Sequence, residues 1–449
     1  MSAKAKARAA GGAAPVRETA PAGAAAPFRY APYVWTYPEE ALLAGPERLA
    51  EQIAALGFGG VAVALTYHRA RLLFPRYGRV ETVPAGHIAF EPDRSRYEAL
   101  APSRTASAET VRAVHELRAA CARHGIGFHA WLVLLHNEAL VAALREAEAQ
   151  SADGASVGRS LCPSHPQSAA YVRALVDDVC RQFGPDGVEV EAAWYPSWEP
   201  GYTITIWQGE PSARALRLGS QCFCRSCRAV FAAAGEDPEK LAAETRAAAG
   251  PPFAVPANGS AAAPSAAGAA GASASACPAV APGAEPADAE AVEAALAARL
   301  IPPRAAVMGR LLARAAVQAH AHGATLRTTA YGEAATVALQ GVTPEAVAGV
   351  DGVILTLGER SDQEMLAHFA ALRRLTGDAP AVVSTNWDPS RTPASIAADV
   401  AALRAAGADG IAFYNHALAP HEALPALAAG AAAAASPGRS IPALPTEAR

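Results

Sequence analysis

An alternation of helix-like and strand-like segments runs through most of this 449-residue sequence and limits its fold more than any other feature. Segments with helical spacing of apolar residues, most of them ending in glycine, alternate with short runs rich in Val, Ile and Leu. We identify eight strand-like runs: YAPYVWTYP, GGVAVALTYH, GIGFHAWLVLLHN, DGVEVEAAWY, ATLRTTAYGE, DGVILTLGER, APAVVSTNWDP and ADGIAFYNH. Strands that alternate with helices in this way are typically parallel and covered by those helices.

Eight such units close most simply into a (β/α)8 or TIM barrel, which we place at residues 28–430. The alternative architecture is an open doubly wound sheet. Against it, no GxGxxG or GxxxxGK phosphate-binding loop follows any early strand. Polar or aromatic residues also stand at the C-terminal ends of nearly all eight runs, where barrel enzymes carry their sites. Both observations favour the barrel.

Three segments fall outside the alternation. Residues 1–27, residues 431–449 and an Ala/Gly/Pro/Ser tract at 246–290, between the fourth and fifth strands, contain few bulky apolar side chains. Such segments bury too little surface to offset the entropy of ordering, so we predict that all three are disordered. Much of the 51% hydrophobic content is alanine in these runs, and the core is correspondingly smaller.

The overall composition excludes several classes of protein. The formal net charge is −4, from 38 basic and 42 acidic residues, and no block of Lys and Arg points to nucleic acid. The first 27 residues lack the apolar stretch of a secretory signal, and no apolar run is long enough to cross a membrane. Seven cysteines in a chain of this length do not resemble a secreted disulfide scaffold. We therefore expect a cytoplasmic protein that contacts neither membrane nor nucleic acid, and the oligomeric state stays open.

The fourth strand carries the strongest functional signal. Because side chains alternate along a strand, Val188 and Val190 fall on one face and Glu189 and Glu191 on the other. An unpaired carboxylate is costly against an apolar layer, so we expect both glutamates to face a polar cavity. Trp194 follows at once, and aromatic faces beside acids are typical of a sugar-binding cleft.

Further candidates lie at or near the ends of other strands. We predict a substrate-binding set of Tyr67, His68, Trp131, His136, Asn137, Trp194, Arg327, Tyr331, Trp387, Tyr414 and Asn415. Asp388, after the seventh strand, is a candidate second carboxylate. Arg327 also offers another interpretation of the glutamates, as members of an internal Arg–Glu network that holds the barrel closed.

A cysteine cluster indicates a metal site. The segment QCFCRSC places Cys222, Cys224 and Cys227 in a CxCxxC spacing, and Cys162 of SLCPSHP is the candidate fourth ligand. Clustered thiolates in a cytosolic chain are usually metal ligands, and tetrahedral zinc takes four. The alternative is a group of reduced, partly buried thiols.

Several of these segments resemble known glycosidases. LCPSHPQSAAYVR is similar to the CPxSPxYR segment of the glycoside hydrolase family 42 β-galactosidases, and CFCRSC is similar to the CxCxxC of that family's zinc site. The resemblance implies Cys162, Cys222, Cys224 and Cys227 as structural zinc ligands. WTYP, LTYHRARLLFPR, HAWLVLLHN and DGVEVE extend the likeness to a group of uncharacterised, glycosidase-like bacterial barrels over most of residues 30–420.

The sequence departs from these families at their catalytic positions. The acid/base glutamate of family 42 follows an asparagine, whereas Glu191 follows Val190, and the strand that would carry the nucleophilic glutamate offers only Asp388. DGVEVE also resembles the DGxDxDxE strand of family 18 chitinases, but Ala193 stands where that family has its catalytic glutamate.

Three functions remain open on the sequence alone. The leading hypothesis is a glycoside hydrolase that uses Glu191 as general acid with Glu189 or Asp388 as its partner. The second is a barrel that binds a glycan or another ligand without catalysis. The third is a metal-dependent hydrolase built on His68, His136 and His416, each of which closes a predicted strand.

Overall fold

The structure is a computed structural model that describes residues 28–197, 212–250, 288–357, 362–386 and 391–435. Of the three segments predicted to be disordered, residues 1–27 and most of the other two lie outside these ranges. Residues 246–249 of the tract belong to the end of one helix, and residues 289–290 begin another. The last described helix continues to Ala434, just past the predicted end of the barrel.

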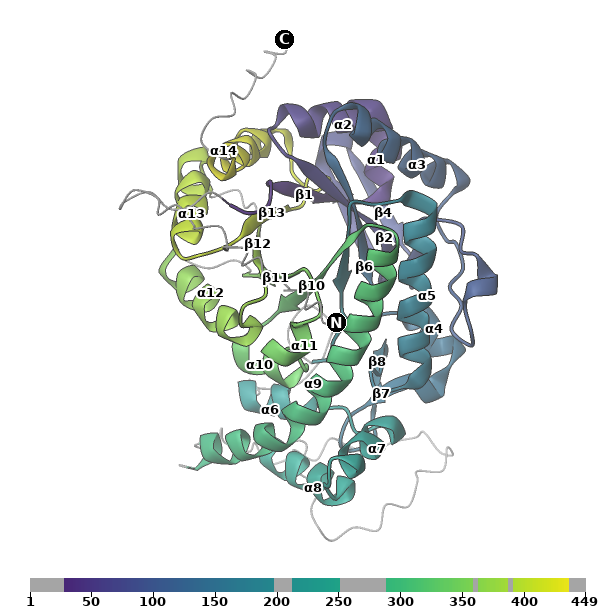
Figure 1. The fold of residues 1–449 in the computed structure, drawn as a ribbon, viewed down its shortest axis with the longest axis vertical. Helices are drawn as coiled ribbons and strands as arrows, with labels where there is room; N and C mark the ends of the chain where they lie inside the picture. Colours follow the sequence, from purple (N-terminus) through teal and green to yellow (C-terminus); the bar gives the residue numbers. More distant parts are fainter. Residues whose placement is uncertain (1–27, 198–211, 251–287, 358–361, 387–390, 436–449) are drawn as a thin grey trace, which may run out of the picture.

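The main sheet is a closed barrel of eight parallel strands, as predicted (Figure 1). The barrel strands are β1 (Tyr33–Thr36), β2 (Gly60–Tyr67), β6 (Gly127–Val133), β9 (Gly187–Glu191), β10 (Thr325–Tyr331), β11 (Gly352–Thr356), β12 (Ala381–Asn386) and β13 (Gly410–Tyr414). Each pairs with the next in chain order, and β1 pairs with both β2 and β13. Those two pairings of β1 close the ring.

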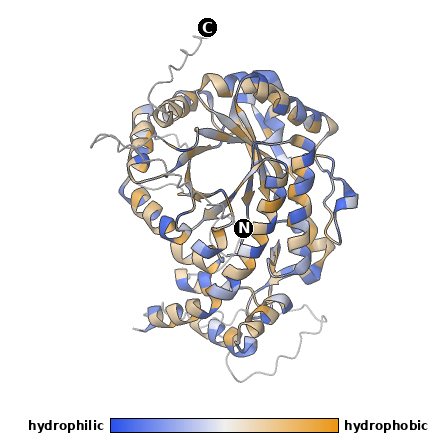
Figure 2. Ribbon diagram, in the orientation of Figure 1, coloured by the Kyte–Doolittle hydropathy of each residue, from blue (hydrophilic) through white to orange (hydrophobic). Residues whose placement is uncertain are grey.

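Helices surround the strands on the outside of the ring (Figure 1). They are α1 (Pro38–Ala44), α2 (Pro46–Ala55), α3 (Ala108–Arg123), α5 (Pro166–Phe183), α9 (Ala289–Ala321), α10 (Ala334–Leu339), α11 (Pro344–Val347), α12 (Asp362–Thr376), α13 (Pro393–Ala405) and α14 (Leu424–Ala434). Hydrophilic residues are found mainly on the surrounding helices, whereas the strands are mostly apolar (Figure 2). This two-layer arrangement buries the strand residues that point away from the barrel axis.

Additional elements extend the loops after three of the strands. After β2 come a hairpin of β3 (Ala70–Phe74) and β4 (Arg79–Val83) and the short β5 (His87–Ile88), which pairs antiparallel with β2. After β6 come α4 (Glu138–Ala143) and a hairpin of β7 (Glu148–Gln150) and β8 (Ser156–Leu161). After β9 come α6 (Ala213–Gly219), α7 (Arg225–Ala233) and α8 (Pro238–Ala249), which lie beside the N-terminal half of α9 (Figure 1).

Side-chain alternation assigns each strand residue to the barrel interior or to the helix layer. On β9, Val188 and Val190 join the large core between strands and helices. A second apolar cluster fills the interior with aromatic and small residues, among them Trp35, Ala64 and Trp131. The two glutamates of β9 therefore project into the interior, on the opposite face from the valines.

A repeated aspartate fixes the register at the N-terminal end of the barrel. Asp186, Asp351 and Asp409 each stand one residue before a strand that begins with glycine. The Asp409 carboxylate accepts a hydrogen bond from the Ala381 backbone N–H at 2.8 Å, and the Asp409 N–H donates to the Ala381 carbonyl at 2.7 Å. Asp186 and Asp351 make the same reciprocal pair with the preceding strand. These aspartates therefore satisfy strand-end donors that the ladder leaves unpaired.

Among the described residues, no helix is both long and apolar enough to cross a membrane.

Candidate active site

Glu191 is the last residue of β9 and lies at the carboxyl-end mouth of the barrel. Its side chain stays partly exposed, and its Oε2 accepts a hydrogen bond of 2.7 Å from the Trp131 indole N–H. Burial raises the pKa of Glu191 to about 7; the Glu189 charge adds to this rise and the Trp131 hydrogen bond opposes it. A carboxyl group with this pKa is suited to donate a proton near neutral pH.

Glu189 lies deeper and has different surroundings. It is fully buried and accepts a hydrogen bond of 2.6 Å from the Trp35 indole N–H. Its other oxygen faces the Arg327 guanidinium at 3.4 Å. Burial also raises the pKa of Glu189, against the lowering effect of Arg327. Arg327 is itself only 6% exposed, and its guanidinium stacks over the Tyr30 ring at 4.5 Å, so this ion pair belongs to the barrel interior.

Aromatic side chains form the wall beside the glutamates. Trp35 and Trp131 stack with their ring centroids 5.2 Å apart, and Tyr414 packs edge-on against Trp35. The Tyr37 hydroxyl lies 2.6 Å from that of Tyr414 and donates to that of Tyr67 at 3.1 Å. Tyr331, at the end of β10, borders the same interior cluster and is partly exposed. Apolar faces with hydroxyl and indole groups on one side suit the alternating faces of a sugar ring.

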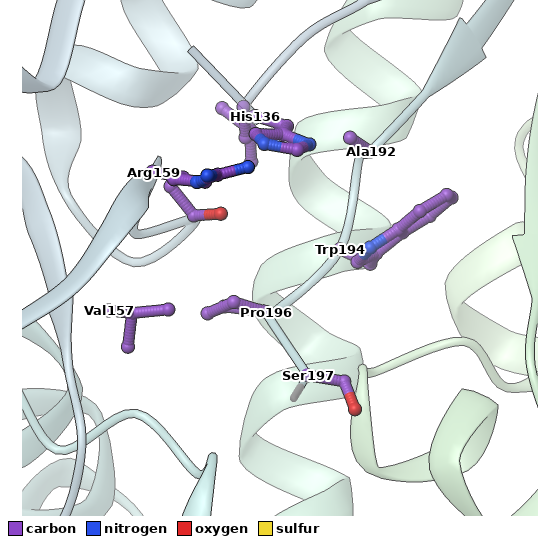
Figure 3. A pocket seen from close by; sticks show the side chains of 9 residues that line it. His136, Val157, Arg159, Ala192, Trp194, Pro196 and Ser197 are labelled. Atoms are coloured by element: carbon purple, nitrogen blue, oxygen red, sulfur yellow. The ribbon is translucent and has the colours of Figure 1, made fainter. Parts of the chain in front are cut away.

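A small pocket, open to solvent, lies beside this mouth (Figure 3). The chain turns sharply after Glu191, because Ala192 adopts a left-handed backbone conformation with φ of 53°. Ala192 therefore leaves the strand direction and lines the pocket. The rest of the lining consists of Leu135, His136, Val157, Arg159, Ser160, Trp194, Pro196 and Ser197.

The strand-end histidines and asparagines have distinct settings. The rings of His68 and His136 stack with centroids 4.7 Å apart, and burial is the main cause that lowers the pKa of both, to about 3 for His136. Asn137 caps α4 by accepting from the Leu140 N–H. Asn415 is 4% exposed and accepts from the Ala417 N–H.

His416 belongs to a buried network that joins helix α1 to two loops, the β3–β4 turn and the segment after β13. Its Nδ1 lies 3.0 Å from both Glu40 oxygens, and Arg76 of the β3–β4 turn bonds to the same carboxylate. Burial would raise the pKa of Glu40, but His416, Arg76 and Thr36 bring it to about 2. In the described part of the chain, His68, His136 and His416 do not form a metal-binding group.

The four cysteines named from the sequence come together in one cluster. Their sulfur atoms all lie within 4.8 Å of one another, with Cys162 3.3 Å from Cys227 and 3.8 Å from Cys222. Four sulfurs around a tetrahedral zinc at about 2.3 Å stand about 3.8 Å apart, so the arrangement fits the ion. All four thiols are buried, and burial raises the pKa of Cys162 and Cys227.

The cysteine cluster also contacts the loop that follows β9. The Ser164 hydroxyl, two residues after Cys162, lies 2.6 Å from the Tyr195 hydroxyl. The Arg304 guanidinium stacks over the Tyr195 ring at 4.8 Å and donates to the Cys222 carbonyl at 3.0 Å. Tyr195 directly follows the pocket residue Trp194, so the cluster supports one wall of the pocket.

Two predicted site residues, Trp387 and Asp388, lie outside the described residues. Sequence reasoning also missed residues that the structure brings to the site. Arg159, Ser160 and Ser197 line the pocket from segments without strand or helix periodicity, and no spacing pattern in the sequence marks them. Tyr37 could have been predicted as a site residue, because it follows directly after the first strand.

The fold and site together define a (β/α)8 barrel with an acidic, aromatic carboxyl-end mouth. No known sequence family matches the chain, and no curated protein is similar to it. Among solved structures, it is similar to the PgaB (BpsB) glycoside hydrolase domain from Bordetella bronchiseptica, with 12% identity, a TM-score of 0.52, and coverage of 90% of this chain and 98% of that one.

Two further barrels show the same likeness. The catalytic domain of β-amylase from Paenibacillus polymyxa matches with 10% identity and a TM-score of 0.53, covering 90% of this chain and 98% of that one. The α-L-fucosidase isoenzyme 2 from Paenibacillus thiaminolyticus matches with 11% identity and a TM-score of 0.50, covering 91% of this chain and 49% of that one. These similarities show that the chain has the fold of glycoside hydrolase barrels.

Proposed function

We propose that this protein is a glycoside hydrolase in which Glu191 is the general acid. The observation that carries the proposal is the setting of Glu191: a carboxyl group with a pKa raised to about 7, at the end of the fourth barrel strand, beside an indole donor. Barrel enzymes place their chemistry at this end of the strands. A protonated carboxyl group there can protonate the leaving oxygen of a glycosidic bond.

In this proposal the two glutamates of β9 have different roles. Glu189 is paired with Arg327 and Trp35 inside the barrel, so it acts on Glu191 through its charge and not as a nucleophile. The reaction then needs a second carboxylate, which we assign to Asp388. Retaining enzymes hold the two carboxyl groups about 5–5.5 Å apart, and inverting enzymes about 6.5–9.5 Å apart.

Hydrolysis of a panel of aryl glycosides tests this assignment. We expect Glu191→Gln and Asp388→Asn to fold and to lose at least about 100-fold in kcat/KM, the low end for removal of an acid or base. Glu51→Gln, on the exposed surface of α2, is the matched control and should be unchanged. Activity of the parent should fall as pH rises through about 7, because Glu191 must be protonated. Retention of activity by Glu191→Gln would remove the proposal.

A barrel that binds a glycan without catalysis is the second candidate. The observation in its favour is that Glu189 is already occupied by an interior ion pair, which leaves Glu191 without a partner on its own strand. Sugar binding by the parent without hydrolysis of any glycoside would support this function.

The cysteine cluster enters the proposal as a structural zinc site, in line with the resemblance to family 42. Cys162, Cys222, Cys224 and Cys227 would hold the ion and would tie the segment before α5 to the start of α7. Four protein ligands leave no open position for substrate, so zinc would contribute to folding only.

A further inference from the structure

Two indole N–H groups meet the two carboxylates of β9 inside the barrel. The Trp131 indole donates to Glu191 Oε2 at 2.7 Å, and the Trp35 indole donates to Glu189 Oε2 at 2.6 Å. The two rings stack with their centroids 5.2 Å apart and their planes 17° from parallel. Each glutamate therefore has its own indole donor, and the two donors belong to one stacked pair.

Small side chains on the strand between the two tryptophans leave space for this stack. Trp35 comes from β1 and Trp131 from β6, and β2 lies between these strands in the barrel. β2 contributes Ala62 and Ala64 to the interior, paired in register with Trp35 and Trp131 respectively. Because the tryptophans are only 3% and 1% exposed, their N–H groups are shielded from water, where a hydrogen bond to a carboxylate would be weaker.

The indole of Trp131 restricts where the proton of Glu191 resides. An indole N–H can only donate, so the Glu191 oxygen that it contacts must accept. In a carboxylic acid the carbonyl oxygen accepts better than the hydroxyl oxygen, so a donor at Oε2 favours the proton on Oε1. Once the proton has left, the same N–H stabilises the negative charge that remains.

The other titratable groups near Glu191 do not take the place of this donor. Glu189, on the same strand, is paired with Arg327 and adds a negative charge. Burial is the main cause that raises the pKa of the Tyr67 and Tyr414 hydroxyls, from β2 and β13, and the Glu191 charge adds to the rise. Both tyrosines therefore remain neutral over the pH range in which Glu191 ionises.

We propose that Trp131 is a positioning residue that holds Glu191 with its proton on Oε1, and that Trp35 keeps Trp131 in place through the stack. The geometry that carries this inference is the pair of parallel indoles, each aimed at one carboxylate of β9. The inference rests on the proposed function, because a positioned proton matters only if Glu191 donates it to a substrate.

The ionisation of Glu191 tests the inference without requiring turnover. NMR of protein isotopically labelled at the glutamate carboxyl carbons follows each carboxyl group, and the signal absent from Glu191→Gln identifies Glu191. We expect Trp131→Phe to raise the pKa of Glu191 by about one unit or more, because a hydrogen bond to the charged form is lost. Trp35→Phe is the matched control, because it disturbs the same stack but keeps the donor at Glu191, and it should shift this pKa less than half as far.

The parent protein gives a second measurement that does not depend on the folding of a variant. One indole N–H signal should move with pH, with a midpoint at about 7, as Glu191 ionises. The same signal should not move in Glu191→Gln. If no indole N–H signal follows Glu191 in the parent, the inference is wrong.

Activity gives a further measurement once a substrate is found. In Trp131→Phe the alkaline limb of the kcat/KM profile should move to higher pH with the pKa of Glu191. The maximal kcat should fall at least about tenfold, with little change in KM, because the acid is less well oriented.

The possible failures are distinguishable. An unchanged or lowered pKa of Glu191 in Trp131→Phe, or an equal rise in Trp35→Phe, overturns the positioning role and leaves the proposed function standing. A loss of activity in Trp131→Phe without a shift of the pH profile also overturns it, because a purely structural role predicts that result. Full activity of Glu191→Gln removes the proposed function itself, whatever the indole does.

Discussion

Glu189 and Glu191 are the same residue type on the same face of one strand, yet their surroundings give them different chemistry. Glu189 is buried beside a guanidinium, whereas Glu191 reaches the mouth and contacts an indole. Burial of a carboxyl group disfavours its charged form, and a nearby cation or hydrogen-bond donor offsets part of that cost. The pair therefore lends itself to tests that separate structure from function.

The stability of the parent should depend on the ionisation of Glu191. Its folded-state pKa is raised from 4.5 to about 7, so its contribution to stability is fully present below pH 4.5 and is lost as pH rises to about 7. At about 1.4 kcal/mol per pKa unit, the loss is at most about 3 kcal/mol. Urea unfolding at pH 5 and pH 8 should show this loss in the parent and not in Glu191→Gln. An identical pH dependence in both proteins would contradict the raised pKa.

Glu189→Gln should instead destabilise the protein at every pH tested. It leaves the Arg327 guanidinium buried without its counter-charge, which typically costs about 3–5 kcal/mol. We expect a large loss of stability at both pH 5 and pH 8, measured by the same urea unfolding. The double variant Glu189→Gln/Arg327→Met should recover much of that loss. A stable Glu189→Gln protein would show that the ion pair does not support the barrel.

At the scale of elements, the strand-end aspartates hold neighbouring strands in register. Asp409→Ala removes the carboxylate that accepts from the Ala381 N–H at the start of β12. A lost charge-assisted hydrogen bond with an unpaired partner costs about 1–3 kcal/mol. Thermal unfolding should show this loss, whereas Asp378→Ala, at an exposed position nearby, should show none. Equal stability of the two variants would mean that water replaces the carboxylate.

The cysteine cluster links two elements that are far apart in sequence. If its four thiolates share an ion, protein purified without chelators should carry about one zinc per chain by metal analysis. Cys224→Ser should lose the metal and unfold at a lower temperature, and Cys121→Ser, on α3 away from the cluster, should retain the zinc. Zinc-free parent protein would remove the proposal.

At the scale of the whole molecule, the tract between α8 and α9 should contribute little to stability. Residues 251–287 lie outside the described residues, and the expectation rests on their composition. Helices α8 and α9, on either side of the tract, also contact each other directly. Arg299 of α9 forms ion pairs with Glu244 of α8 and with Glu236, just before α8. Replacing 251–287 by a short Gly/Ser linker should leave the melting temperature unchanged. Loss of the fold would show that the tract has a structural role.

The sequence by itself determined the barrel, because fold class depends on local periodicity. Eight strand-like runs alternate with helices, and strand alternation alone puts the β9 glutamates opposite Val188 and Val190. The CxCxxC spacing likewise indicates three of the clustered cysteines from the sequence alone, with Cys162 as the candidate fourth.

Only the tertiary structure decided how the two glutamates differ and where the pocket lies. Arg327 reaches Glu189 from a strand 138 positions further along the chain, and Trp131 reaches Glu191 from 60 positions before it. Arg159 lines the pocket from the β7–β8 hairpin, whose sequence has no helix or strand periodicity that would mark it as part of a site. Periodicity records which face a side chain occupies. Charge, burial and pKa depend on neighbours that folding brings from distant segments, and no local pattern encodes them.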